Sequence, residues 1–363
     1  MSASPAIIEA AESAGLHYTT DSMPGISRRK AGKGWSYRYF DGRPVRDAAD
    51  LDRIRKLAIP PAYRDVWICM DERGHLQATG LDARGRKQYR YHPDFRKLQD
   101  ENKFKRMLHF GQALPKIREG MDHDLRLKGF PERKVLAVIV YLLEKSLIRV
   151  GNEEYAKENK SFGLTTMRTR HVSIHGEHIE FNFLGKSKIK HRIDIHDRRL
   201  ARVIKKLQEL PGQELFQYLD DSGKRCSVSS SDVNAYLQEL SGGEHFTAKD
   251  FRTWWGTVLA LTELSHRDVP PSKMGLKKAV TAVMKAVSQQ LGNTPAICRK
   301  SYVHPVVLDA FEHNTLRGFL KTHPEEAENV EDFVRCAEAA LIDMLQHETL
   351  PANPDRKKKR KAA

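Results

Sequence analysis

Four short segments of the sequence place arginine, lysine, asparagine and tyrosine side chains in basic surroundings. They are Ile148–Asn152, Phe183–Lys186, Lys249–Thr253 and Gly292–Tyr302. Transfer of a phosphodiester needs a nucleophile, cationic donors on the non-bridging oxygens and a proton for the leaving oxygen. Tyrosine can be the nucleophile when cations stabilise its oxyanion, arginine binds phosphate through two parallel hydrogen bonds, and lysine can supply the proton. The segments therefore hold the groups for phosphodiester chemistry without a metal.

Nucleotide and metal motifs do not fit the chain. Leu184–Ser187 is similar to the end of a P-loop, but the glycine required five residues before Gly185 is replaced by Glu180. The cluster His175–His178 lies where a hairpin turn is expected and lacks the HExxH spacing of a zinc site, which favours a polar turn. The four cysteines form no CxxC pair. We therefore expect no cofactor and no metal.

The charge of the chain points to a polyanionic partner. The net charge is +15, and it is still +10 without residues 351–363, which hold six basic side chains and one acidic one. Nucleic acid is the leading partner for such a charge. The longest apolar run, Val135–Leu143, is too short to span a membrane, and the acidic N-terminus is unlike a signal peptide. We expect a cytoplasmic protein that associates with the nucleoid.

Composition and periodicity divide the chain. Short alternating runs with many turn residues predict a β-rich DNA-binding domain over residues 26–96, preceded by an extension over residues 1–25. A charged linker, 97–105, leads to a mainly helical catalytic domain over residues 106–350. Within that domain, alternation around the turn 185–188 predicts a hairpin with Lys186 at its tip. The basic residues 351–363 are expected to form a disordered tail. The predicted fold class is α+β.

The order of the chemical groups resembles one known constellation. Arginine, lysine, arginine, asparagine and tyrosine in this succession are similar to the catalytic residues of the type IB DNA topoisomerases, in particular the poxvirus-like bacterial branch. The resemblance covers roughly residues 26–346. It implies the tyrosine recombinase/topoisomerase IB catalytic fold, with Tyr302 as nucleophile, Lys186 as general acid, and Arg149, Arg252 and Asn293 as donors to the phosphate.

The same resemblance implies the activity and the DNA contacts. It implies relaxation of supercoiled duplex DNA through a 3′-phosphotyrosyl intermediate, without ATP or metal, by a monomer that clamps around the duplex. Gly85–Tyr91 resembles the strand that reads the DNA major groove in the viral enzymes. The residues predicted to contact DNA are Arg86, Lys87, Gln88, Tyr89, Tyr91 and Tyr155.

Asn293 departs from the viral pattern, which has a histidine there. An amide N–H can still donate to a phosphate oxygen, but it cannot become cationic or carry a proton. Two other interpretations stay open. A tyrosine recombinase shares the chemistry, but recombinases generally have a histidine at the position of Lys249 and a helical first domain. The second alternative, a non-catalytic DNA-binding protein, accounts for the positive charge. It does not account for the five chemical groups that occur in this order along the chain.

Overall fold

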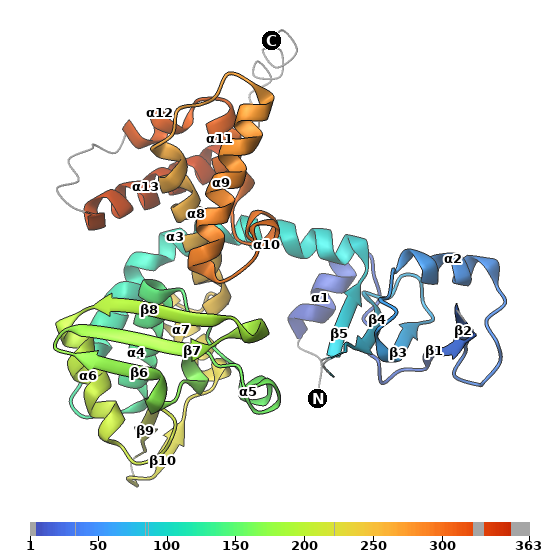
Figure 1. Ribbon diagram of the computed structural model, residues 1–363, viewed down its shortest axis with the longest axis horizontal. Coiled ribbons are helices and arrows are strands. Elements are labelled where there is room, and N and C mark those ends of the chain that lie inside the picture. Colours follow the sequence, from blue (N-terminus) through green and yellow to red (C-terminus); the bar gives the residue numbers. More distant parts are fainter. Residues whose placement is uncertain are drawn as a thin grey trace. The chain divides into compact units, whose positions relative to one another are not determined.

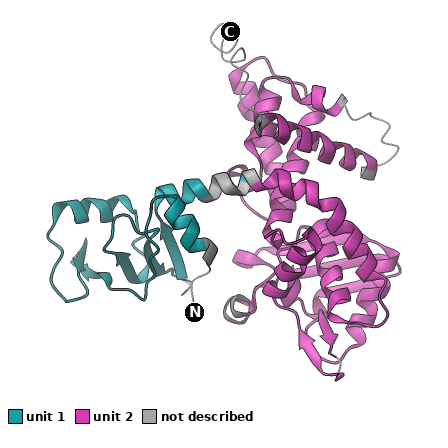
Figure 2. Cartoon of the chain, turned by 180° about the vertical axis from the view of Figure 1, so that it is seen from behind, with its two compact units in different colours: residues 1–105 teal, residues 106–363 magenta. Residues whose placement is uncertain are grey.

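The computed structural model describes residues 5–32, 34–83, 85, 87–220, 222–321 and 330–349 (Figure 1). The chain divides into two compact units, residues 1–105 and residues 106–363 (Figure 2). Among the described residues, no helix is both long and apolar enough to cross a membrane. The predicted tail, 351–363, lies outside the described residues.

The first unit is built on one antiparallel sheet of five strands. The strand order is β2-β1-β3-β4-β5. Asp47 begins the second helix as its N-cap, where its carboxylate accepts a hydrogen bond from the Asp50 amide. The elements are α1 (Pro5–Ser13), β1 (Gly25–Ala31), β2 (Gly34–Arg38), α2 (Ala48–Lys56), β3 (Arg64–Cys69), β4 (Leu76–Leu81) and β5 (Lys87–Tyr91).

The two faces of this sheet differ in character. One face carries the core of the unit, where Ile54 of α2 packs against Ile26, Ile68 and Ala78 of the strands. The opposite face carries a row of directly paired residues that crosses all five strands. This cross-strand row runs Arg38, Ser27, Trp67, Thr79, Tyr89. Side chains alternate between faces along a strand, so the row and its neighbours two residues away face away from the core.

The second unit is mainly helical and contains a three-stranded antiparallel sheet in the order β6-β7-β8. The long helix α3 (Pro93–Leu125) crosses the boundary between the units. The remaining helices are α4 (Glu132–Ser146), α5 (Glu153–Asn159), α6 (Arg198–Glu209), α7 (Ser230–Ser241), α8 (Ala248–Ser265), α9 (Lys273–Leu291), α10 (Pro295–Ser301), α11 (Pro305–Glu312), α12 (Leu316–Lys321) and α13 (Val330–Thr349). The strands are β6 (Val172–His175), β7 (His178–Leu184), β8 (Lys190–His196), β9 (Gln217–Leu219) and β10 (Arg225–Ser227). Short 3₁₀ turns cover Leu164–Thr166 and Thr169–His171, and the turn Lys186–Lys188, which contains non-helical backbone, joins β7 to β8.

Helix α8 is the central element of the second unit. It packs against α4, α7, α9, α11 and α13, and Trp254 at its middle is completely buried. A helix surrounded by others on every side is apolar nearly all round, as α8 is after its first turn. Lys249 and Arg252 lie near its N-terminal end, so the packing of α8 in the core fixes the backbone that carries both side chains, and Arg252 is itself buried.

The predicted fold class is confirmed, because a mainly β region precedes a mainly helical one that contains a short hairpin sheet. The segment expected as a linker, residues 97–105, belongs to helix α3. Part of the expected N-terminal extension also has regular structure. Helix α1 contributes Ala11 to a small core with Leu16 and Phe95, which belong to the first unit.

Candidate active site

The segment that carries Asn293 and Tyr302 is a tight helix-to-helix connection. Gly292 ends α9 with φ +57°, a left-handed conformation that glycine adopts without steric cost. Thr294 then accepts a hydrogen bond from the Ile297 amide as the N-cap of α10, and Pro295 occupies the first helical position. Tyr302 ends this helix, and its amide donates to the Cys298 carbonyl at 2.9 Å. The glycine, threonine and proline together determine this local fold.

Arg252 holds the ends of two helices together. Its guanidinium donates to the carbonyl oxygen of Leu147, just after α4, and to that of Leu291, at the end of α9, at 2.6 Å. Carbonyls at helix C-termini have no partner within the helix and carry partial negative charge, which suits a buried cation. Only 4% of Arg252 is exposed. Burial and the neighbouring charge of Arg149 lower the pKa of Arg252 to about 10, which still leaves it cationic at neutral pH.

Arg149 binds the asparagine that departs from the viral pattern. Its Nη2 donates to Asn293 Oδ1 at 2.6 Å and to the Gly292 carbonyl at 3.2 Å. Asn293 Nδ2 and Arg252 Nε are buried and have no hydrogen-bond partner among the residues that the structure describes. Buried donors are almost always satisfied in folded proteins, so two unsatisfied donors in one site indicate a place for an acceptor such as a phosphate oxygen.

Tyr302 lies under the positive charge of this site. The Arg252 guanidinium is 5.3 Å from the centroid of the Tyr302 ring. Burial alone would raise the pKa of Tyr302. The charges of Arg252 and Arg149, a hydrogen bond from Arg252 and the charge of Lys249 outweigh that effect and lower the pKa below its ordinary value of 10. The phenolate that a nucleophilic tyrosine must form is therefore stabilised.

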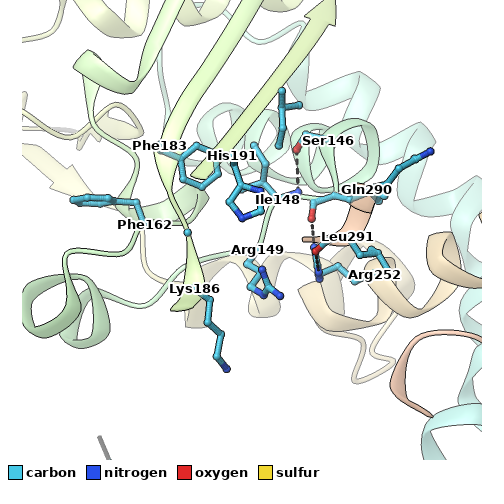
Figure 3. A pocket seen from close by; sticks show the side chains of 13 residues that line it. Ser146, Ile148, Arg149, Phe162, Phe183, Lys186, His191, Arg252, Gln290 and Leu291 are labelled. Atoms are coloured by element: carbon cyan, nitrogen blue, oxygen red, sulfur yellow. Dashed lines mark hydrogen bonds between the residues drawn. The ribbon is translucent and has the colours of Figure 1, made fainter. Parts of the chain in front are cut away.

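Lys186 lies at the tip of the β7–β8 hairpin, as the sequence predicts. The Gly185 amide closes the turn by donating to the Ile189 carbonyl at 2.8 Å. Lys186, Arg149 and Arg252 line one pocket (Figure 3). The Lys186 side chain is exposed, and in Figure 3 it points away from the other labelled side chains.

The structure joins two pairs of the predicted catalytic residues by direct contacts, Arg149 with Asn293 and Arg252 with Tyr302. The charges of both arginines act on Tyr302, and Lys186 lines the same pocket as the two arginines. Sequence reasoning missed two further members as site residues. Lys249 contributes to the low pKa of Tyr302, and its position one helical turn before Arg252 was the available signal. The ring of His191 also lines the pocket. No local motif marks it, since its neighbours come from distant parts of the chain.

The predicted DNA contacts on β5 do not all share one face. Tyr89 and Tyr91 stack on each other with ring centroids 6.1 Å apart, on the face opposite the core of the first unit. Tyr89 is 46% exposed, whereas Tyr91 packs against the small core of α1 and Phe95. Gln88 points to the other face and donates to Asp82 at 3.1 Å.

The other predicted DNA contacts have different surroundings. Lys87 forms an ion pair of 2.5 Å with Asp21, which raises the pKa of the lysine. Arg86 lies outside the described residues. Tyr155 belongs to α5, but its side chain is also outside the described part of the chain.

Comparison with known proteins agrees with this geometry. A family model described as the catalytic core of eukaryotic DNA topoisomerase I matches residues 92–327, and one described as the N-terminal domain of bacterial DNA topoisomerase IB matches residues 34–82. The DNA topoisomerase 1B of Acanthamoeba polyphaga mimivirus is 36% identical over 299 residues, which cover 80% of this chain and 89% of that protein. The DNA topoisomerase 1B of vaccinia virus (strain Copenhagen) is 25% identical over 252 residues, 68% of this chain and 75% of the viral one. Because a catalytic-core model matches more than half of the chain and a viral enzyme aligns with most of it, the chain belongs to the type IB DNA topoisomerase family.

Proposed function

We propose that the enzyme relaxes supercoiled duplex DNA through a covalent bond between Tyr302 and a 3′-phosphate. The Tyr302 oxygen attacks phosphorus, the bond from phosphorus to the 5′-oxygen breaks, and that oxygen takes a proton from Lys186. The free strand rotates about the intact one. The 5′-hydroxyl then returns its proton to Lys186 as it attacks phosphorus, and the bond from phosphorus to the Tyr302 oxygen breaks. The observation that carries this proposal is the position of Tyr302 beneath Arg252, where two arginines lower its pKa.

The donors of the site suit the transition state of this reaction. Negative charge grows on the non-bridging oxygens as phosphorus becomes five-coordinate, and donors already aimed at those oxygens need no rearrangement. Arg252 Nε and Asn293 Nδ2, the two buried donors that have no partner in the described part of the chain, are assigned to these oxygens together with Arg149. Arg149 also holds the amide of Asn293 in one orientation through its Oδ1.

This mechanism needs neither ATP nor a metal ion. The phosphotyrosyl bond keeps the energy of the phosphodiester bond, so religation requires no other source. The arginines, Asn293 and Lys186 supply the charge stabilisation and the proton that a metal ion supplies in other phosphoryl transfers.

We assign duplex binding in the first unit to the sheet face that bears the cross-strand row. Arg38 and Tyr89 are exposed at its two ends, and Arg29, two residues from Ser27 on the same face, is also exposed. Aromatic and guanidinium groups on an open surface suit bases and phosphates. We propose that both units contact the same duplex and that one molecule acts alone.

The decisive experiment is relaxation of a supercoiled plasmid by the full chain in EDTA without ATP. We expect complete relaxation by the wild-type enzyme and none by Tyr302→Phe, which should still bind duplex DNA. A requirement for ATP or a divalent ion would overturn the proposal. Exchange between two DNA sites without relaxation would favour the recombinase, and binding without any change of linking number would favour a non-catalytic protein.

A further inference from the structure

The imidazole ring of His191, in strand β8, lies against two glycines that each precede a proposed catalytic residue. A Cβ atom added to Gly185 would be 2.6 Å from His191 Cδ2 and Nε2, and one added to Gly292 would be 2.3 Å from His191 Cε1. Non-bonded carbon atoms prefer separations of about 3.5–4.0 Å. The ring therefore fits only because both positions are glycine. Lys186 follows the first of them and Asn293 follows the second.

The ring is held from its other side. It stacks on Phe183, its direct partner in strand β7, with centroids 5.1 Å apart and planes 15° apart. Figure 3 shows the ring of His191 beside Phe183 and above Arg149. The ring also lines the pocket. Because the ring contacts Phe183, Gly185 and Gly292, its width sets the separation between the hairpin turn and the end of α9.

The charges that face the ring favour its neutral form. Burial, and then the guanidinium groups of Arg149 and Arg252, lower the pKa of His191. The neutral ring adds no third positive charge beside the arginines, so it fills space without opposing the charge of Arg149.

The hairpin turn that the ring contacts has an unfavourable backbone conformation. Ser187 and Lys188 both have positive φ, 64° and 59°, a conformation unfavourable for residues with a side chain. A turn of this kind keeps its shape when surrounding contacts determine it. The ring of His191 against Gly185 is such a contact, at the residue that begins the turn.

We propose that His191 is a positioning residue. Its ring lies between Lys186 on one side and Asn293 with Arg149 on the other, and it holds these two sides at the separation that strand cleavage requires. The inference rests on the proposed function of these groups. His191 itself touches none of the reacting atoms.

A double-mutant cycle between Gly185 and His191 tests the contact. Gly185→Ala places a methyl group against the ring, and His191→Ala removes the ring, so each single variant should cleave DNA about 10²-fold more slowly in a single turnover. The double variant should be no slower than His191→Ala alone, because the methyl group of residue 185 then has room. Multiplication of the two defects, or wild-type cleavage by His191→Ala, would overturn the inference. The matched control is His196→Ala, an exposed histidine on the same strand, which should cleave at the wild-type rate.

A second measurement separates positioning from loss of folded protein. A 5′-bridging phosphorothiolate substrate releases a thiolate that needs no proton, so it bypasses the general acid. On this substrate the defect of His191→Ala should shrink at least tenfold, as should that of Lys186→Ala. Both substrates are tested with the same protein preparation, so an unfolded fraction lowers both cleavage rates equally and leaves their ratio unchanged. Rescue of Lys186→Ala without rescue of His191→Ala would overturn the role of His191. Failure to rescue either would overturn the acid role of Lys186, and the double-mutant cycle would then decide for His191 alone.

Discussion

Arg149 and Asn293 are joined by a hydrogen bond of 2.6 Å from the guanidinium Nη2 to the amide Oδ1. This bond decides which end of the amide faces Arg149, because only the oxygen can accept. The amide nitrogen is consequently turned away from Arg149, buried, and without a partner in the described part of the chain. The pair thus presents an N–H donor where the viral enzymes present a histidine.

Removing that donor should slow cleavage. We expect Asn293→Ala to reduce the single-turnover cleavage rate by about 10²–10³-fold, the scale for one donor to a developing oxyanion. Asn293→Asp keeps an acceptor for Arg149 but has no N–H, and it adds negative charge, so its loss should be at least as large. Rates would be measured on an oligonucleotide whose cleaved end diffuses away. Near-wild-type cleavage by Asn293→Asp would show that the amide N–H is not used.

Restoring the viral residue should introduce a pH dependence. A neutral amide does not titrate between pH 5 and 9, whereas a histidine changes charge near an ordinary pKa of about 6.5. Asn293→His should keep substantial activity and gain an inflection near neutrality in its pH–rate profile. The wild-type profile should lack that inflection. A wild-type inflection that disappears in Asn293→Ala would contradict the prediction.

The pKa of Tyr302 should respond to Arg252. Burial opposes ionisation of the tyrosine, and Arg252 and Arg149 reverse that effect, so the folded enzyme should form the Tyr302 phenolate at a pH below 10. Arg252→Ala removes the cation that lowers this pKa most and should shift the ionisation to higher pH. The measurement is the phenolate absorbance of each protein minus that of its Tyr302→Phe counterpart. An unchanged titration in Arg252→Ala would show that the arginine does not stabilise the phenolate.

The side chains that we propose for catalysis could be selected from the sequence because their order along the chain is specific. The contacts that make them a site could not, since they join residues far apart. Arg252 binds the carbonyls of Leu147 and Leu291, and His191 touches Gly292. The periodicity around residues 134–150 predicts one helix, but α4 ends at Ser146, where Leu147 turns to φ 56° and the chain leaves toward Arg149.

The first unit shows the limit of local patterns in a different way. Alternation along β5 already implied that Gln88 and Tyr89 face opposite sides of the sheet, and the structure has them so. The ion pair of Lys87 with Asp21 was not predictable, because it depends on how residues 19–25 fold over the sheet. Residues 97–105 lack an apolar stripe, which is why a connector was predicted where α3 continues.

The buried carboxylate of Glu338 should matter for stability. It accepts two hydrogen bonds from Arg118, at 2.8 and 3.0 Å, and one from Trp254 Nε1 at 2.8 Å, so it joins α13 to α3 and α8. Glu338→Ala leaves Trp254 Nε1 without its acceptor and leaves Arg118 with Glu144 as its remaining partner, at 2.7 Å. We expect a loss of about 3 kcal/mol in the free energy of unfolding, the lower end of the range for a broken buried pair, because 32% of the Arg118 side chain is exposed. Chemical denaturation would measure it, with Glu338→Gln as the milder control. A loss below about 1 kcal/mol would exclude this role.

The final prediction concerns which face of the five-stranded sheet meets DNA. Arg29 and Lys30 are adjacent, exposed residues of β1 that face opposite sides, Arg29 with the cross-strand row and Lys30 with the core face. Each phosphate that a protein neutralises steepens the dependence of log K on log salt concentration by about 0.9. In a Tyr302→Phe background, which prevents cleavage, Arg29→Ala should therefore reduce the slope by about 0.9, and Lys30→Ala should leave it unchanged.

Tyr89, at the end of the cross-strand row, and Gln88, on the opposite face, allow a second comparison of the two faces. Tyr89→Ala removes an exposed ring from the cross-strand row and should weaken duplex binding at every salt concentration without changing the slope, because the ring carries no charge. Gln88→Ala alters the other face and tests whether its amide, now bonded to Asp82, reads a base. Because the duplex is assigned to the opposite face, the cleavage-site preference on a mapped plasmid should stay unchanged, and a flattened preference would show that Gln88 reads a base. A reduced slope in Lys30→Ala with none in Arg29→Ala would place the duplex on the core side of the sheet and contradict the assignment of the cross-strand row.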